Sequence, residues 1–119
     1  MAEERRKTIR IKKPLTAQYS YTVDGKQIWD MSLIKDLSES GICLGTNKIF
    51  PLNDIFFIRL KVPIRPSLSL EIYGRVVESR EFKAGINITR VEFTDLKDEQ
   101  KELLREYIAW MLVKERGGK

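Results

Sequence analysis

Three residues in the first half of the chain, Asp36, Ser38 and Gly41, have the side chains and the spacing of a small polar binding site. If residues 36–38 are extended, Asp36 and Ser38 leave the same face, because side chains alternate along a strand. A carboxylate and a hydroxyl there can accept hydrogen bonds from a donor-rich edge, such as the N–H groups of guanine. The other interpretation is an ordinary tight turn, since Asp, Ser and Gly are common turn residues.

The basic residues near the amino terminus offer the complementary chemistry. Residues 3–13 include Arg5, Arg6 and Arg10. A guanidinium group is planar and suits phosphate oxygens, the O6/N7 edge of guanine and stacking on a base. We expect residues 1–13 to form a flexible basic arm, and two interpretations stay open. The arm is either a solvated charged tail or a segment that wraps a small anion and changes shape as it does so.

Composition narrows the class of protein. The chain has 119 residues, of which 42% are hydrophobic and 33% are charged, so one globular domain is expected. The net charge of +5 favours an anionic partner. No apolar run is long enough to span a bilayer and no signal peptide is evident, so we expect a cytoplasmic protein without membrane insertion.

The sequence has few of the residue types that usually carry out catalysis or bind metal ions. The chain has no histidine, which removes the most common general base and the most common metal ligand. The single cysteine, Cys43, excludes an internal disulfide and a cysteine-cluster metal site. It sits in an apolar run and is interpreted as a small buried residue. We therefore expect neither an enzyme nor a metal or other cofactor.

The elements that would position these residues are mainly strands. Six runs have the composition of strands: 15–23, 27–35, 42–45, 55–62, 68–79 and 86–93. Asp24-Gly25 is a strong hairpin signal between the first two. Residues 63–66 begin and end with proline and must interrupt pairing, Gly74 predicts a bend or bulge, and residues 80–85 predict a polar turn. Residues around Arg10 alternate as a short extended segment would if it docked on a sheet.

A helix is predicted over residues 96–115, with acidic residues in its first turn and basic residues near its end. Its apolar residues cover an arc of roughly 200°, wider than the ~100° that one docked face needs. Either the helix lies in a deep groove of the sheet, or a second face meets another chain, as in a homodimer. The predicted fold over residues 14–119 is mainly β, a six-stranded antiparallel β-barrel with a C-terminal α-helix. The first hairpin would bring the arm close to residues 36–41.

Together these two separated elements resemble the PilZ domain. Arg6 and Arg10 fit its Arg-x-x-x-Arg motif, and Asp36, Ser38 and Gly41 fit its Asp/Asn-x-Ser-x-x-Gly motif. Each motif alone is weak, but their order, their spacing and the predicted strands and helix agree over nearly the whole chain.

The resemblance implies a barrel that binds cyclic di-GMP, a bacterial second messenger. By resemblance, Arg6 and Arg10 would hold a phosphate and a guanine edge, Asp36 and Ser38 would meet the second guanine, and Gly41 would shape the turn. An arginine directly before the first motif, here Arg5, goes in the family with an intercalated ligand dimer.

One position departs from the family pattern. Family members usually carry a glycine three residues before the phenylalanine of the last strand, and Arg90 stands there in this chain. A large cation at that position would crowd the barrel wall or reach a ligand or partner, and it puts the local geometry of the last strand in question.

The leading hypothesis is a cyclic di-GMP receptor or adaptor. Its arm would move onto the barrel when ligand binds and signal to a protein partner that the sequence does not identify. The family suggests control of motility, polysaccharide secretion or biofilm. Two alternatives are a small basic barrel that binds single-stranded nucleic acid, and a protein-interaction module without ligand.

Overall fold

The computed structural model describes residues 9–10, 15–61 and 69–117, without the side chains of residues 9–10 and 113–117. The described elements are β1 (Ile9–Arg10), β2 (Thr16–Val23), β3 (Lys26–Leu37), β4 (Gly41–Thr46), β5 (Ile55–Lys61), β6 (Ser69–Lys83), β7 (Ile86–Thr94) and α2 (Asp98–Gly117). Of the described helices, none is long and apolar enough to cross a membrane.

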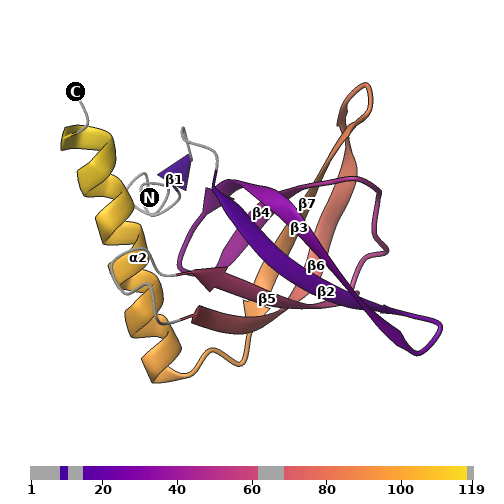
Figure 1. Cartoon of the computed structure of the whole chain (residues 1–119), viewed down its shortest axis with the longest axis horizontal. Helices are drawn as coiled ribbons and strands as arrows, with labels where there is room; N and C mark the ends of the chain where they lie inside the picture. Colours follow the sequence, from indigo (N-terminus) through magenta and orange to yellow (C-terminus); the bar gives the residue numbers. More distant parts are fainter. Residues whose placement is uncertain (1–8, 11–14, 62–68, 118–119) are drawn as a thin grey trace.

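Strands β2 to β7 close into an antiparallel barrel (Figure 1). They follow the order β3-β2-β5-β6-β7-β4, and β3 also pairs with β4 to complete the ring. The closure depends on β3, which is 12 residues long. Its first part pairs with β2 up to Leu33, and its last part pairs with β4 from Leu33 onward. The predicted six-stranded barrel with a C-terminal helix is confirmed.

The two-residue strand β1 lies on the barrel beside the end of β3. Arg10 pairs with Asp36, and Ile9 pairs with Leu37. Both β3 residues also pair with β4. A strand has only two edges, so β1 must lie on the edge of β3 that β2 occupies further back. The prediction that the segment around Arg10 docks on a sheet is confirmed for residues 9–10.

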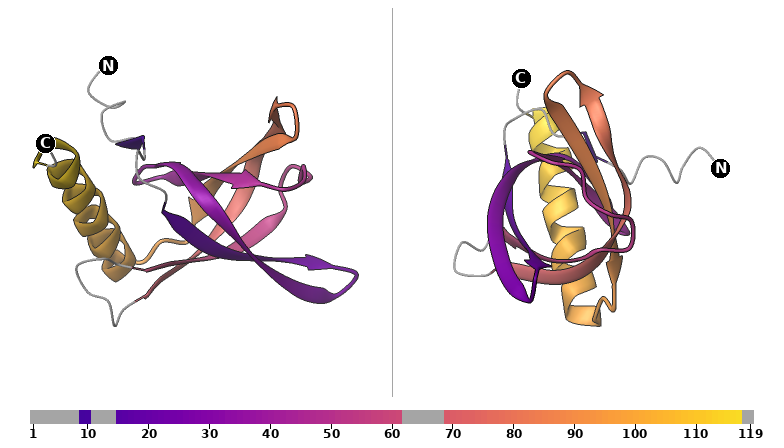
Figure 2. Two further views of the ribbon diagram at one scale, coloured as in Figure 1. Left: turned by 45° about the horizontal axis from the view of Figure 1, so that its top comes forward. Right: turned by 90° about the vertical axis from the view of Figure 1, so that its right-hand side faces the viewer.

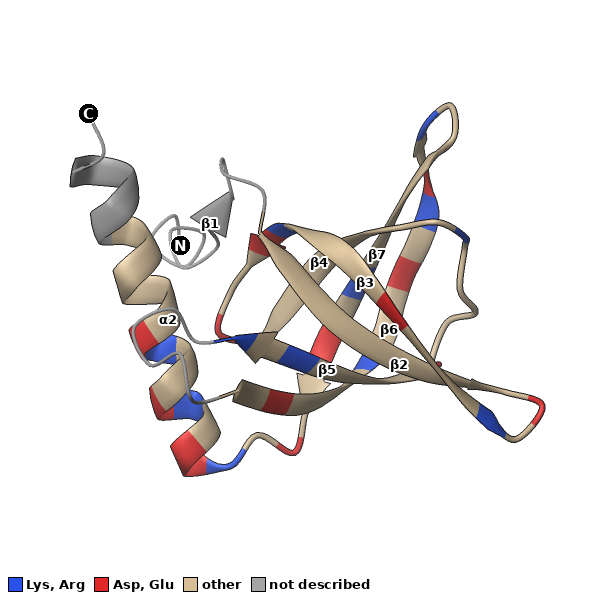
Figure 3. Cartoon of the chain, in the orientation of Figure 1, with Lys and Arg blue, Asp and Glu red and all other residues tan. Residues whose placement is uncertain are grey.

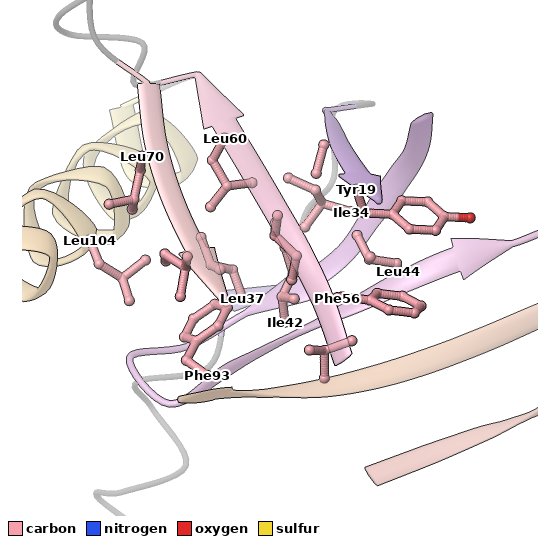
Figure 4. Close-up of a cluster of buried hydrophobic side chains, with 14 of the residues drawn as sticks. Tyr19, Ile34, Leu37, Ile42, Leu44, Phe56, Leu60, Leu70, Phe93 and Leu104 are labelled. Carbon is pink, nitrogen blue, oxygen red and sulfur yellow. The ribbon is translucent and has the colours of Figure 1, made fainter. Parts of the chain in front are cut away.

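The core fills the barrel with alternate residues of strands β2 to β7 (Figure 4). Tyr19, Phe50 and Phe56 pack together as an aromatic group within it, with the Tyr19 and Phe56 ring centroids 5.0 Å apart. Burial raises the pKa of Tyr19 to about 12. The apolar interior thus holds together strands that are far apart in the sequence.

Helix α2 covers one end of the barrel, as the end-on view in Figure 2 shows. Leu104, Tyr107, Ile108 and Met111 belong to the core cluster, and Leu103 and Trp110 pack against it. The predicted docking of the helix on the sheet is confirmed, and the broad apolar arc is used partly for this contact.

Three local expectations were wrong. Asp36 and Leu37, predicted as part of a turn, form the end of β3. Residues 80–83, predicted as a polar turn, continue β6 into a protruding hairpin. A polar composition indicates that a segment is exposed to solvent, but an exposed strand of a hairpin can also be polar. The expected irregularity at Gly74 instead appears between Val76 and Glu78. The predicted interruption at residues 63–66 lies outside the described residues.

Candidate ligand-binding site

One row of residues crosses five strands, and each member is the direct partner of the next. In spatial order the row contains Arg10 of β1, Asp36 of β3, Cys43 of β4, Arg90 of β7 and Glu78 of β6. We call it the charged row. Directly paired residues of a sheet share a face, so Asp36, Arg90 and Glu78, which are far apart in the sequence, become neighbours.

The members of the charged row on β3, β4, β7 and β6 lie on the outer wall of the barrel. Cys43 stands between the core residues Ile42 and Leu44, so its own side chain points outward. It is nevertheless only 2% exposed. Arg90 and Asp36 lie on the two strands beside it, and their side chains approach each other above it. Burial raises the pKa of Cys43 to about 11, so the thiol is protonated at neutral pH. The prediction of a buried cysteine is confirmed.

The turn after β3 is held by Ser38. Its backbone N–H donates to the carbonyl of Gly41 at 2.9 Å. Its hydroxyl oxygen accepts from the backbone N–H groups of Ser40 and Gly41, each at 3.2 Å. The interpretation of a tight turn is thus confirmed for residues 38–41, and the hydroxyl of Ser38 fixes its shape.

A groove of about 430 Å³ opens beside this turn. It is lined by Asp36, Ser38, Ser40, Gly41, Ile42, Val77, Arg90, Val91 and Glu92. Of the described residues that line it, Arg90 is the sole cation, and Asp36 and Glu92 are acidic. Figure 3 shows both signs of charge on the strands of the barrel wall. An anion in this groove therefore needs further positive charge from outside the lining residues.

Arg90 bridges two carboxylates of the charged row. Its Nε lies 3.2 Å from Oε1 of Glu78, and its Nη1 lies 3.8 Å from Oδ1 of Asp36. Arg80 hydrogen-bonds Glu78 and is the main cause that lowers the pKa of that carboxyl, with Arg90 adding to the effect. The Arg90 side chain is 47% exposed, so it does not crowd the interior of the barrel.

The six predicted site residues fall into two groups. Asp36, Ser38 and Gly41 line one groove. The backbone of Arg10 lies opposite Asp36, and its side chain is outside the described part of the structure. Arg5 and Arg6 also lie outside the described residues. The structure therefore brings the second motif and one end of the first motif together.

Two acidic residues at the site were not singled out from the sequence, Glu78 and Glu92. Glu78 faces Arg90 only because the register of β6 shifts between Val76 and Glu78. Glu92 lies beyond Arg90 on β7 and pairs with Arg75 at 2.5 Å. The sequence carries no local signal for either contact, because both depend on which strands are neighbours. In the described residues, no group of three or more His, Cys, Asp or Glu could hold a metal ion.

Gly41 is needed because two backbones approach closely. A Cβ added there would lie 2.5 Å from the carbonyl oxygen of Val91. We expect Gly41→Ala to push β4 from β7 and to lower the free energy of unfolding by about 1–3 kcal/mol, as measured in urea. Gly45→Ala is the matched control, since its nearest contact would be 3.4 Å to the end of Lys35. Equal stability of the two variants would contradict this close approach.

Comparisons with known proteins agree with this geometry. The family model described as the PilZ domain matches residues 4–110. Among solved structures, the PilZ domain of YcgR from Escherichia coli with c-di-GMP is 14% identical with a TM-score of 0.72, covering 94% of this chain and 95% of that one. The MrkH–c-di-GMP complex of K. pneumonia is 11% identical with a TM-score of 0.74, covering 94% of this chain and 53% of that one.

A third similar structure is the PilZ domain of CeSA from a cellulose-synthesizing bacterium. It is 15% identical with a TM-score of 0.62, and the match covers 87% of this chain and 98% of that one. A search of curated proteins gives no match. The family model extends over most of the chain and includes both motifs. This chain belongs to the PilZ domain family.

Proposed function

We propose that this protein is a non-enzymatic receptor for cyclic di-GMP, which binds in the groove beside Asp36 and is held there by the arginines of the arm. The observation that carries the proposal is the pairing of Arg10 with Asp36, which joins the two motifs on one wall of the barrel. Family membership and the similarity to PilZ domains solved with c-di-GMP support the same ligand.

The chemistry of the groove suits a guanine base. The Asp36 carboxylate can accept from the N1–H and N2–H donors of guanine. The hydroxyl of Ser38 already bonds the turn, so its role is to hold the groove in shape. The ligand is a dianion, and the acidic lining of the groove would repel it without added cations. Arg5, Arg6 and Arg10 would supply them through phosphate and guanine contacts.

Ligand binding would then change the surface shown to a partner. Because β1 already pairs with β3, the part of the arm before β1, which carries Arg5 and Arg6, would settle on the barrel when the phosphates neutralise it, as an ordering switch. The turn is linked to the helix by an ion pair, because Oε1 of Glu39 lies 3.7 Å from Nε of Arg105 in α2. A change at residues 38–41 would therefore reach α2 as well as the arm. The downstream protein is unidentified, and motility or biofilm control is the family's suggestion.

Titration calorimetry of the full chain with cyclic di-GMP tests the proposal. We expect saturable binding, and two ligands per chain if Arg5 marks an intercalated dimer. Single-stranded oligonucleotides are titrated at the same salt concentration, since binding of that class would weaken steeply with salt. Absence of heat and of a mobility shift at tens of micromolar dinucleotide would reject the receptor. Oligonucleotide that displaces the dinucleotide would favour the nucleic-acid alternative.

A further inference from the structure

Asp36 has an arginine on each side of it in the charged row. Arg10 lies one strand away, on β1, and belongs to the family motif. Arg90 lies two strands away, on β7, and belongs to neither motif. Its guanidinium group nevertheless lines the groove and approaches the Asp36 carboxylate. Arg90 therefore lies on the side of Asp36 opposite to Arg10, where it can contact a ligand in the groove.

We infer that Arg90 is a further ligand-binding residue and that it reads one guanine of the dinucleotide together with Asp36. The inference rests on the proposed function. It assigns to Arg90 the O6/N7 acceptors of the base, and to Asp36 the N1–H and N2–H donors of the same base.

The geometry of the pair fits a shared base. Nη1 of Arg90 and Oδ1 of Asp36 are 3.8 Å apart, longer than the ~2.7–2.9 Å of a charge-assisted hydrogen bond. The two groups are therefore adjacent without being closed on each other. Guanine carries its acceptors and donors side by side, so adjacent arginine and carboxylate groups match it. Adenine has an amino donor in place of O6, and this donor would face the donors of Arg90.

Glu78 is a positioning residue for Arg90. It lies on the side of the guanidinium away from Asp36, 3.2 Å from Nε. Holding Nε restricts rotation of the planar guanidinium, while Nη1 lies near Asp36, which lines the groove. Without Arg90, the lining would keep the carboxylates of Asp36 and Glu92, which repel a dianionic ligand. Both base recognition and charge thus predict that loss of Arg90 weakens binding.

The test compares Arg90→Gly, which restores the residue usual in the family, with Arg90→Lys. Each variant and the wild type are titrated with cyclic di-GMP and with cyclic di-AMP. A good bidentate arginine–guanine contact corresponds to about tenfold to 100-fold in affinity. We expect Arg90→Gly to lose about that factor for cyclic di-GMP and to lose preference for guanine over adenine. Arg90→Lys keeps the charge and should recover overall attraction without recovering the preference.

Two further variants keep the result interpretable. Arg59→Ala removes another exposed arginine, which pairs with Glu71 at 3.0 Å and does not line the groove, so its affinity should equal that of the wild type. Arg90→Gln retains the length of the side chain, and replaces Arg90→Gly if the glycine variant lacks a cooperative melting transition.

The outcomes separate the two proposals. If the wild type fails to bind cyclic di-GMP, the proposed function fails and this inference falls with it. If the wild type binds and Arg90→Gly binds equally well, only the inference is overturned. Tighter binding by Arg90→Gly would also overturn it, because Arg90 would then compete with the ligand for the Asp36 carboxylate. Equal losses for both dinucleotides would show attraction of anions without base recognition, which again contradicts it.

Discussion

Replacing both Arg6 and Arg10 by alanine is expected to lower the affinity for cyclic di-GMP by about 100-fold or more. Each arginine would lose charge-assisted hydrogen bonds to a phosphate or a guanine edge, and such bonds contribute about 1.5–3 kcal/mol each. Two losses of this size correspond to roughly 100-fold or more in the dissociation constant. Calorimetric titration of the double variant measures the change, and thermal melting should show that the barrel remains folded.

The matched control removes two other positive charges from the same arm, as Lys12→Ala with Lys13→Ala. Both control residues lie just outside the Arg-x-x-x-Arg motif. If binding depended only on the net charge of the arm, the two double variants would lose the same affinity. The arginine site predicts a much smaller loss for the lysine variant. Undiminished binding by the arginine variant would contradict the assignment of Arg6 and Arg10.

The parts of the fold that were predicted from the sequence depend on local chemistry. Asp24 and Gly25 both have positive φ, at 52° and 77°, and they join β2 to β3 as the dipeptide indicates. The alternation around Arg10 predicted an extended segment, but its partners, Asp36 and Leu37 of β3, are distant in the sequence. The turn is determined by residues that are neighbours in the sequence, so it is predictable without knowing which strands pair.

The parts that were missed depend on contacts between distant strands. Asp36 continues β3 because β1 and β4 pair with it from both edges, and no nearby residue reports this. Glu78 meets Arg90 through a register shift in β6. Trp29 of β3 likewise lies on the outer wall, 41% exposed, where its ring contacts the ring of Phe57 of β5.

In the candidate site too, local features were predictable from the sequence and contacts between distant strands were not. From the residues alone, Asp36 and Ser38 were compatible with a plain turn, and the turn interpretation proves correct for Ser38. The family motif was needed to connect them with Arg10, and the barrel then shows the physical basis of that connection. Arg90 stood out in the sequence only as a departure from the family pattern. Its place in the groove follows from the pairing of β7 with β4.

The stability of the barrel core can be tested at Phe56 of β5. We expect Phe56→Ala to lower the free energy of unfolding by about 3–5 kcal/mol. The ring is fully buried, stacks on Tyr19 at 5.0 Å and meets Phe50 edge-on at 4.9 Å. It also lies opposite Gly74, which has no side chain to fill the space that the variant would leave. Urea unfolding measures the change, which is a large part of the stability of a small domain.

Phe82→Ala is the control, because the same change there removes a ring that is 52% exposed in the β6–β7 hairpin. We expect it to alter the free energy of unfolding by no more than about 0.5 kcal/mol. Equal effects at Phe56 and Phe82 would contradict the packing of the barrel core. The charged row is assembled from strands that only the closed barrel holds in register. A large loss at Phe56 should therefore reduce the fraction of molecules that can bind the dinucleotide, whereas Phe82→Ala should leave binding unchanged.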